Sequence, residues 1–284
     1  MPRAVPEEPP VHPQRAAMLI PSLSPDAIQK ALTSQRLGKN IHWFETVNST
    51  NVQAHALARQ GAPEGDLVIA EEQTHGKGRL GRNWSSPSRL NLYLSLILRP
   101  NLPPAHAPQI TLMAAVAVAD TVQSFGPFPL EIKWPNDVLV GGRKIAGVLT
   151  ESSSDGTRVF FVILGIGVNL NFPREQMPEE IRDKATSLIE LMQKPVDRNA
   201  FAGRLIHNLD QCYGSLEASG FDEIARRWDG YFRLRGERVR VVMPEGDASG
   251  RAVGIDVDGA LILEGEGGRR ERILAGDVIP QEKS

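Results

Sequence analysis

The segment from Gly76 to Arg82 reads GKGRLGR and combines three glycines with three cations. Glycines free the backbone to turn its N–H groups toward an anion, and the segment holds no carboxylate that could neutralise its charges. A buried strand is expected just before it, at residues 67–70. This arrangement predicts a site for a phosphate or a carboxylate group.

The glycines of this loop also satisfy the spacing GxGxxG, but the loop does not fit a dinucleotide-binding fingerprint. That fingerprint requires the third glycine to open a helix. Here the chain continues as NWSSPS, which is a poor helix start, and then as an apolar strand at residues 92–98. The phosphate-binding pattern GxxxxGK[ST] does not occur in the sequence either.

Further polar stretches lie at the ends of expected elements. They are Ser49-Thr50-Asn51, Gln73, Lys133-Trp134-Pro135-Asn136-Asp137 and Lys144, and Asn169 follows another expected strand. Each stretch alone also has an ordinary structural explanation. Thr50 and Gln53 have the spacing of a capping box at the start of a helix. Lys144 suits a solvated hairpin, Asn169 suits a turn, and tryptophans most often belong to a core.

The elements that must position these residues form an α+β pattern. Strands are expected at residues 41–44, 67–70, 92–98, 130–134, 138–140, 145–151 and 158–168, and helices at 24–35, 54–60, 110–125, 197–219 and 221–228. Several neighbouring strands are joined by short turns, which predicts a mixed, mostly antiparallel sheet with helices packed against it. Short strands at 239–242, 252–255, 260–263 and 272–274 predict a small C-terminal β-barrel.

We therefore divide the chain into three parts: a Pro-rich extension with a lead-in helix at residues 1–38, a large domain at 39–233 and the small barrel domain at 234–284. Residues 1–17 contain five prolines and no apolar core of a signal peptide, so we expect them to be disordered.

Bulk composition narrows the function classes. Lys and Arg number 32 and Asp and Glu 34, so no overall positive charge favours nucleic acid. One cysteine, Cys212, excludes an intramolecular disulfide framework and suits a reducing compartment. No apolar run reaches the length of a membrane span. These features predict a cytoplasmic protein that binds neither DNA nor a membrane.

Taken together, the motifs STN, GKGRxGR, KWPND and KxAG, in this order, resemble those of biotin protein ligases. The resemblance is strongest from Ile41 to Asn171 and weaker up to Val278, and ATSL at residues 185–188 also resembles a stretch of the family. It implies a catalytic domain like that of class II synthetases, in a short form without a DNA-binding domain. It also implies that biotin and Mg-ATP give biotinyl-5′-AMP, from which biotin passes to a lysine of a biotin carboxyl carrier domain of acetyl-CoA carboxylase or another carboxylase.

The resemblance assigns roles by position. The residues implied to bind biotin are Ser49, Thr50, Asn51, Gln73, Lys77, Gly78, Arg79 and Lys144. Those implied to bind ATP or the adenylate are Gly76, Arg79, Arg82, Trp84, Lys133, Asn136, Asp137, Gly147 and Asn169. Arg79, Lys144 and Lys77 are the implied catalytic cations, and Asp137 is the candidate metal ligand. Lys77 stands where the family often has arginine, which keeps the charge but loses the forked geometry.

Rival readings remain open. A lipoate or octanoyl transferase on a related fold would have only Cys212 for a cysteine nucleophile, and the expected helix around Cys212 favours a buried core role. A biotin-responsive repressor would need a DNA-binding domain ahead of Ile41, where the chain is short and partly Pro-rich. The protein could be a monomer or a homodimer, and the strand expected at 158–168 is a candidate edge for pairing.

Overall fold

The computed structural model describes residues 20–34 and 36–281, so most of the expected N-terminal extension lies outside the described residues. Its helices are α2 (Pro25–Ala31), α3 (Thr50–Arg59), α4 (Pro108–Gln123), α5 (Glu179–Arg182), α6 (Leu188–Met192), α7 (Arg198–Ser219) and α8 (Asp222–Tyr231). Its strands are β1 (Ile41–Val47), β2 (Leu67–Gln73), β3 (Leu92–Leu98), β4 (Leu130–Lys133), β5 (Asp137–Val140), β6 (Arg143–Ser154), β7 (Val159–Val168), β8 (Arg238–Val242), β9 (Ala248–Ile255), β10 (Leu261–Glu264), β11 (Arg270–Ile273) and β12 (Asp277–Pro280).

A seven-stranded sheet forms the centre of the molecule, with the strand order β1-β2-β3-β7-β6-β5-β4. Strands β1 and β2 pair in parallel, whereas the other neighbours are antiparallel. The predicted α+β class with a mixed, mostly antiparallel sheet is therefore confirmed. Strand β7 lies between β3 and β6, so the prediction that it is an edge strand available for dimer pairing is wrong. Strand order depends on long-range packing, which a local pattern does not reveal.

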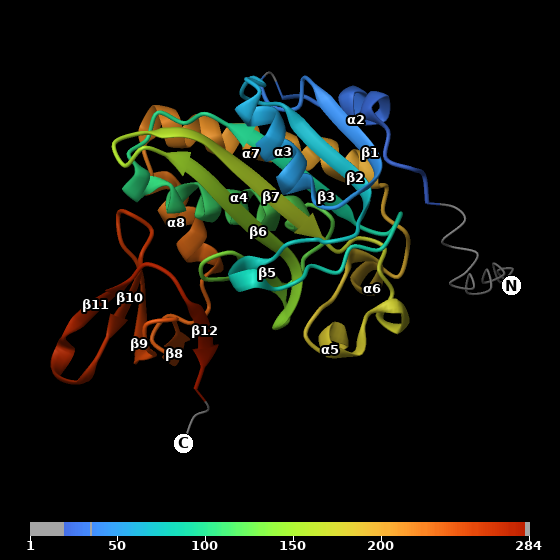
Figure 1. The fold of residues 1–284 in the computed structure, drawn as a ribbon. Coiled ribbons are helices and arrows are strands. Elements are labelled where there is room, and N and C mark those ends of the chain that lie inside the picture. The colour runs from blue at the N-terminus through green and yellow to red at the C-terminus, as the bar shows by residue number, and fades with distance from the viewer. Residues whose placement is uncertain (1–19, 35, 282–284) are drawn as a thin grey trace, which may run out of the picture.

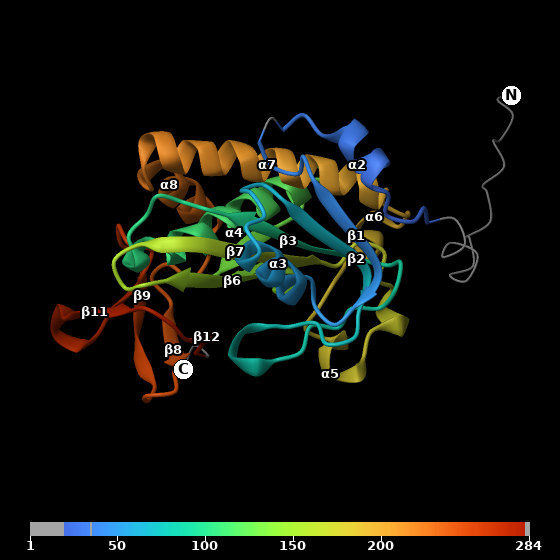
Figure 2. The same cartoon turned by 45° about the horizontal axis from the view of Figure 1, so that its top comes forward.

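Helices cover both faces of this sheet (Figures 1 and 2). Helix α4 packs on one face beneath α7, and α3 packs on the other against β2, β3 and β7. Nearly every residue of α4 is buried because it lies between the sheet and α7. The predicted cap of α7 is present, since the Asp197 side chain accepts hydrogen bonds from the N–H groups of Asn199 and Ala200.

A buried ion pair fixes one end of α7. Arg198 and Glu71 are both almost fully buried, and Arg198 Nη1 lies 2.7 Å from Glu71 Oε2. Glu71 Oε1 also accepts a hydrogen bond from the N–H of Leu23 at 2.5 Å, and Arg198 Nη2 donates to the carbonyl of Pro21 at 2.8 Å. This cluster joins α7 and β2 to the segment that leads into α2.

The C-terminal strands form a second sheet with the order β11-β10-β9-β8-β12, drawn in red in Figure 1. The predicted small C-terminal β domain is present, but no pairing among the described residues joins β11 to β12, so the sheet is open and the prediction of a β-barrel is wrong. Strand β12 was not expected from the sequence. It pairs with β8 and forms one edge of the sheet.

The two sheets meet at the turn around Gly259. Trp134 Nε1 donates a hydrogen bond to the Gly259 carbonyl at 3.0 Å. Gly259 has φ +87°, and a Cβ there would lie 2.6 Å from Leu112 Cδ1, so only glycine fits this contact. Among residues 20–34 and 36–281, the helices are too short or too polar for any of them to cross a membrane.

Candidate active site

The basic loop folds back on itself between β2 and β3. The N–H of Gly78 donates to the Arg82 carbonyl at 2.7 Å, and the N–H of Trp84 donates to the Gly76 carbonyl at 2.9 Å. The N–H of Arg82 donates to the Arg79 carbonyl at 3.1 Å. These three N–H groups have partners inside the loop, so they are not free to bind an anion. The cationic side chains lie near carboxylates: Lys77 Nζ is 3.9 Å from Glu151, and Arg79 and Arg82 are next to Asp277.

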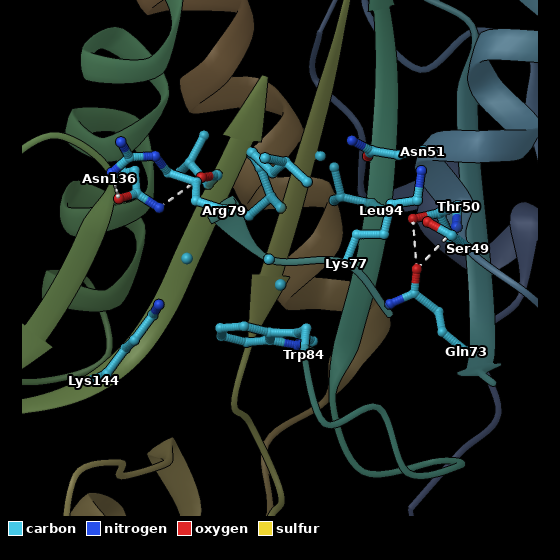
Figure 3. A pocket seen from close by; sticks show the side chains of 17 residues that line it. Ser49, Thr50, Asn51, Gln73, Lys77, Arg79, Trp84, Leu94, Asn136 and Lys144 are labelled. Carbon is cyan, nitrogen blue, oxygen red and sulfur yellow. Dashed lines mark hydrogen bonds between the residues drawn. The ribbon is translucent and has the colours of Figure 1, made fainter. Parts of the chain in front are cut away.

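One hollow collects most of the predicted residues (Figure 3). The predicted residues that line it are Ser49, Thr50, Asn51, Gln73, Lys77, Gly78, Arg79, Trp84, Asn136, Lys144 and Gly147. Ser49, Thr50 and Gln73 gather on one side, Arg79, Asn136 and Lys144 lie on the other, and Trp84 lies between them. One end of the hollow is therefore built from uncharged polar groups, and the other carries cations.

The uncharged end is held by hydrogen bonds between side chains. Gln73 Oε1 accepts from the N–H of Thr50 at 2.9 Å and from Thr50 Oγ1 at 3.1 Å. The expected capping box is therefore wrong: Ser49 is the N-cap without a side-chain bond, and Thr50 is the first helical residue. Gln73, from the neighbouring strand, takes the place of Gln53 as the partner.

Further residues that the motifs did not reveal complete this end. Ser95 Oγ lies 2.8 Å from Thr50 Oγ1 and 2.6 Å from Asn51 Oδ1. Asn51 Nδ2 donates to Glu151 Oε2 at 2.7 Å, and Lys77 Nζ lies 3.9 Å from Glu151 Oε1. This chain of contacts fixes the orientation of the Asn51 amide.

Two glycines of β7 leave room for these side chains. A Cβ at Gly165 would lie 2.8 Å from Cγ of Asn51, and one at Gly167 would lie 2.5 Å from Cε2 of Trp84. Both distances are shorter than those seen for real Cβ atoms. Glycine inside a strand often marks such a close approach, so the GIG pattern at residues 165–167 is a sequence signal that could have identified both positions.

Trp84 separates this hollow from a second one. Lys144 Nζ lies 5.2 Å from the centroid of the Trp84 ring, within the range of a cation–π contact. Trp84 Nε1 is buried and has no hydrogen-bond partner among the described residues. A buried donor without a partner is unusual in a folded protein, and this one lies close to Gly167 of β7.

Arg79 is fixed at the cationic end. Its Nη1 donates to Asn136 Oδ1 at 3.1 Å, and Asn136 Nδ2 donates to the Val148 carbonyl at 2.9 Å. Burial lowers the pKa of the Arg79 guanidinium, while the nearby carboxylates of Asp277 and Asp137 act in the opposite direction. An arginine remains protonated despite such a shift, so Arg79 presents a charge in a partly desolvated position.

The second hollow holds the remaining predicted residues except Gly76. It is lined by Arg82, Lys133, Asp137 and Asn169, and it shares Gly78, Arg79, Trp84, Asn136 and Lys144 with the first hollow. Lys144 Nζ lies 2.7 Å from Asp137 Oδ1. Asn169 Nδ2 donates to the Thr186 carbonyl at 3.1 Å, so its amide also has a structural task. Gly76 is the first residue of the basic loop, and it lines a third groove.

Comparisons with known proteins show which families and relatives this chain resembles. The Biotin/lipoate A/B protein ligase family matches residues 43–169, and the biotin protein ligase C-terminal domain matches residues 235–279. The bifunctional ligase/repressor BirA of Bacillus subtilis is 37% identical over 256 residues, which cover 90% of this chain and 78% of BirA. The biotin--[acetyl-CoA-carboxylase] ligase of Mycobacterium tuberculosis is 36% identical over 268 residues, which cover 90% of this chain and 97% of that protein.

A solved structure gives the same result. The biotin protein ligase from Aquifex aeolicus in complex with biotin and ATP has a TM-score of 0.73 and 31% identity, and the match covers 86% of this chain and all of that one. The comparisons support a ligase rather than a lipoate or octanoyl transferase, and Cys212 is buried, as a core residue would be. The chain belongs to the biotin protein ligase family.

Proposed function

We propose that this ligase works in two steps and that its acceptor is a biotin carboxyl carrier domain of acetyl-CoA carboxylase or a related carboxylase. In the first step a carboxylate oxygen of biotin attacks the α-phosphorus of ATP, and the bond to the β-phosphate breaks with release of pyrophosphate. In the second, the amine of the carrier lysine attacks the acyl carbon of biotinyl-5′-AMP. An amide forms, AMP leaves, and the amine loses a proton to solvent.

The observation that carries the proposal is the polarity of the first hollow. Thr50, Asn51 and Gln73 offer neutral donors and acceptors, which suit the uncharged ureido ring of biotin. Arg79 and Lys144 lie at the other end, where they can neutralise the biotin carboxylate and the α-phosphate as charge develops on phosphorus. Lys77, on the basic loop, also lines the hollow, but it lies toward Asn51, with its Nζ 3.9 Å from Glu151. One end of the hollow would thus bind the ureido ring, and the other end would stabilise the charges of the reacting groups.

The second hollow is the place we assign to the nucleotide. Arg82 and Lys133 line it together with Trp84, whose indole offers an apolar surface. Gly147 pairs with Gly167 beneath Trp84, which keeps this wall close to the sheet. Exclusion of water by the loop would protect the reactive anhydride from hydrolysis.

Magnesium would enter with ATP. Among the described residues no group of three or more His, Cys, Asp or Glu side chains could form a dedicated metal cage. Mg²⁺ bound to a nucleotide uses one or two carboxylates together with phosphate oxygens, and Asp137 in the second hollow fits that requirement. The ion would neutralise phosphate charge, while Lys144, 2.7 Å from Asp137, would hold the carboxylate in place.

Transfer of labelled biotin tests the proposal. The enzyme is incubated with labelled biotin, ATP, magnesium and a carrier domain, and label on the carrier lysine is measured after electrophoresis. We expect transfer by the parent and by Lys194→Ala, an exposed lysine outside both hollows, and loss of most transfer in Lys144→Ala. Absence of label on every carrier domain offered would refute the acceptor class.

Two further expectations have their own measurements. The prediction that the protein does not bind DNA is tested by a gel shift at physiological salt, where a retained complex would contradict it. Sedimentation at several protein concentrations, with and without biotin and ATP, distinguishes a monomer from a homodimer.

A further inference from the structure

The cations of the basic loop already have an anionic partner in the C-terminal sheet. Asp277, the first residue of β12, forms an ion pair with Arg82, and its Oδ1 lies 3.8 Å from Arg79 Nη1. Arg79 Nη1 also donates to the carbonyl of Gly276 at 3.3 Å. The loop and β12 are thus joined through charges that are nearly 200 residues apart in sequence.

Asp277 occupies a place where a carboxylate is unfavourable for the proposed reaction. It lines the second hollow together with Lys144 and Asp137, which we assign to ATP. Its side chain is 21% exposed, so bulk water screens it only in part. A phosphate that approached Arg79 and Arg82 would meet this carboxylate at the same cations, and two anions so close repel each other.

We propose that Asp277 is an internal anion that holds the basic loop against the C-terminal sheet in the ligand-free enzyme, and that the phosphates of ATP replace it. The inference rests on the proposed function, because it needs the second hollow to take the triphosphate. Asp277 then acts through Arg79 and Arg82 and has no contact with the reacting atoms. It is a positioning residue for the ligand-free state.

Thermodynamic linkage gives the sign of the effect. An interaction made only in the free enzyme has to be lost when ATP binds, so it weakens ATP binding, and its removal strengthens binding. Arg82 is 66% exposed, which makes its pair with Asp277 a weak one, whereas Arg79 is 19% exposed. Exposed pairs contribute little, so we expect Asp277→Asn to bind the nucleotide about twofold to fivefold more tightly.

The first measurement is calorimetric. With saturating biotin, the α,β-methylene analogue of ATP, which cannot release pyrophosphate, is titrated into the parent, Asp277→Asn and the control Glu264→Gln. Glu264 pairs with Arg270 in the same sheet but lines neither hollow. We expect tighter binding only in Asp277→Asn. The gain should disappear in an Arg82→Ala, Arg79→Ala background, where no cation remains to be released.

The second measurement follows the loop itself. Lys77, Arg79 and Arg82 are trypsin sites, so the rate of cleavage within the loop reports how often it leaves the sheet. We expect faster cleavage of ligand-free Asp277→Asn than of the parent or Glu264→Gln, and equal protection of all three once biotin and the analogue are bound.

Each outcome decides the inference. Weaker or unchanged binding of the analogue by Asp277→Asn would overturn it, since a metal ligand or a permanent clamp gives one of those results. A cleavage difference that persists with ligands bound would overturn it too. Transfer of biotin to a carrier is measured on the same preparations: if the parent transfers biotin and the Asp277 results fail, only the internal anion is refuted.

Discussion

Replacement of Gly165 by alanine should weaken biotin binding without unfolding the protein. The new methyl group would lie 2.8 Å from Cγ of Asn51, whereas ordinary van der Waals contact begins near 3.4 Å. Strand β7 is central and pairs on both sides, so its backbone has little freedom to retreat. The Oδ1 atom of Asn51 would lie closer to the new methyl group than Cγ does, so the Asn51 side chain must move by more than the roughly 0.6 Å that the Cγ distance alone requires.

That movement breaks the contacts that orient the Asn51 amide. Its Oδ1 lies 2.6 Å from Ser95 Oγ, and its Nδ2 lies 2.7 Å from Glu151 Oε2. A hydrogen bond contributes about 0.5–1.5 kcal/mol, and a misplaced amide also loses its contact with the ligand. We expect biotin affinity to fall by about 1–2 kcal/mol, a factor of about 5 to 30.

Calorimetric titration of biotin gives the affinity, and thermal unfolding followed by circular dichroism shows that the variant is folded. Gly214→Ala is the matched control: it lies in α7 with no atom within 4 Å of the new Cβ, and the change to alanine favours the helix. It should bind biotin as the parent does. ATP binding in the absence of biotin should be the same in all three proteins, because Asn51 lies at the uncharged end.

The reasoning would be refuted by a folded Gly165→Ala protein that binds biotin within twofold of the parent. Equal losses of biotin and ATP affinity would also contradict it, since they would indicate a general distortion of the sheet.

Three other perturbations test separate parts of the structure. Arg79→Ala should slow biotin-dependent ATP–pyrophosphate exchange by about tenfold to 150-fold, because hydrogen bonds to charged groups contribute about 1.5–3 kcal/mol; normal exchange would remove Arg79 from the mechanism. Arg198→Met leaves the buried Glu71 carboxylate without its cation and should lower the free energy of unfolding by about 3–5 kcal/mol in urea titrations, while Glu71→Leu combined with Arg198→Met should recover most of it. A loss below about 1 kcal/mol for the single change would show that the pair is not needed. Burial raises the pKa of Cys212 from 9.0 to about 11, so the thiolate forms more readily in the unfolded chain. The free energy of unfolding is therefore unaffected by this group below about pH 9. It falls as the pH rises toward 11, by up to about 2–3 kcal/mol. The decline should be smaller in Cys212→Ala; equal pH profiles would contradict the shift.

Local patterns predicted the elements whose sequence leaves few alternatives. Strand β3 is apolar except for Ser95 and is buried along its whole length. Helix α7 begins at the aspartate cap that its sequence indicates. The polar motifs also came together, because each lies at the end of an element that a pattern could place. Their separate roles in binding biotin and ATP stay predictions until the substitutions above are measured.

The wrong predictions concern side chains and N–H groups whose actual partners come from distant parts of the sequence. Thr50 had a capping partner three residues away, but Gln73 from β2 accepts its hydrogen bonds instead. The loop glycines were expected to present N–H groups to an anion, but the N–H of Gly78 donates a hydrogen bond to the Arg82 carbonyl. The carboxylate that faces the loop, Asp277, belongs to a strand that no pattern indicated. Such pairings follow from the way the two sheets pack together, and a short stretch of the sequence does not reveal that packing.

Two of the contacts between the C-terminal sheet and the rest of the molecule differ in physical character. At Gly259 the contact consists of a buried hydrogen bond from Trp134 and close packing on Leu112, which dissolved salt does not screen. At Asp277 the contact with the loop is ionic and partly exposed, so it weakens as ionic strength rises. A rise in ionic strength should therefore weaken the contact between Asp277 and the loop more than the hydrogen bond and the apolar packing at Gly259.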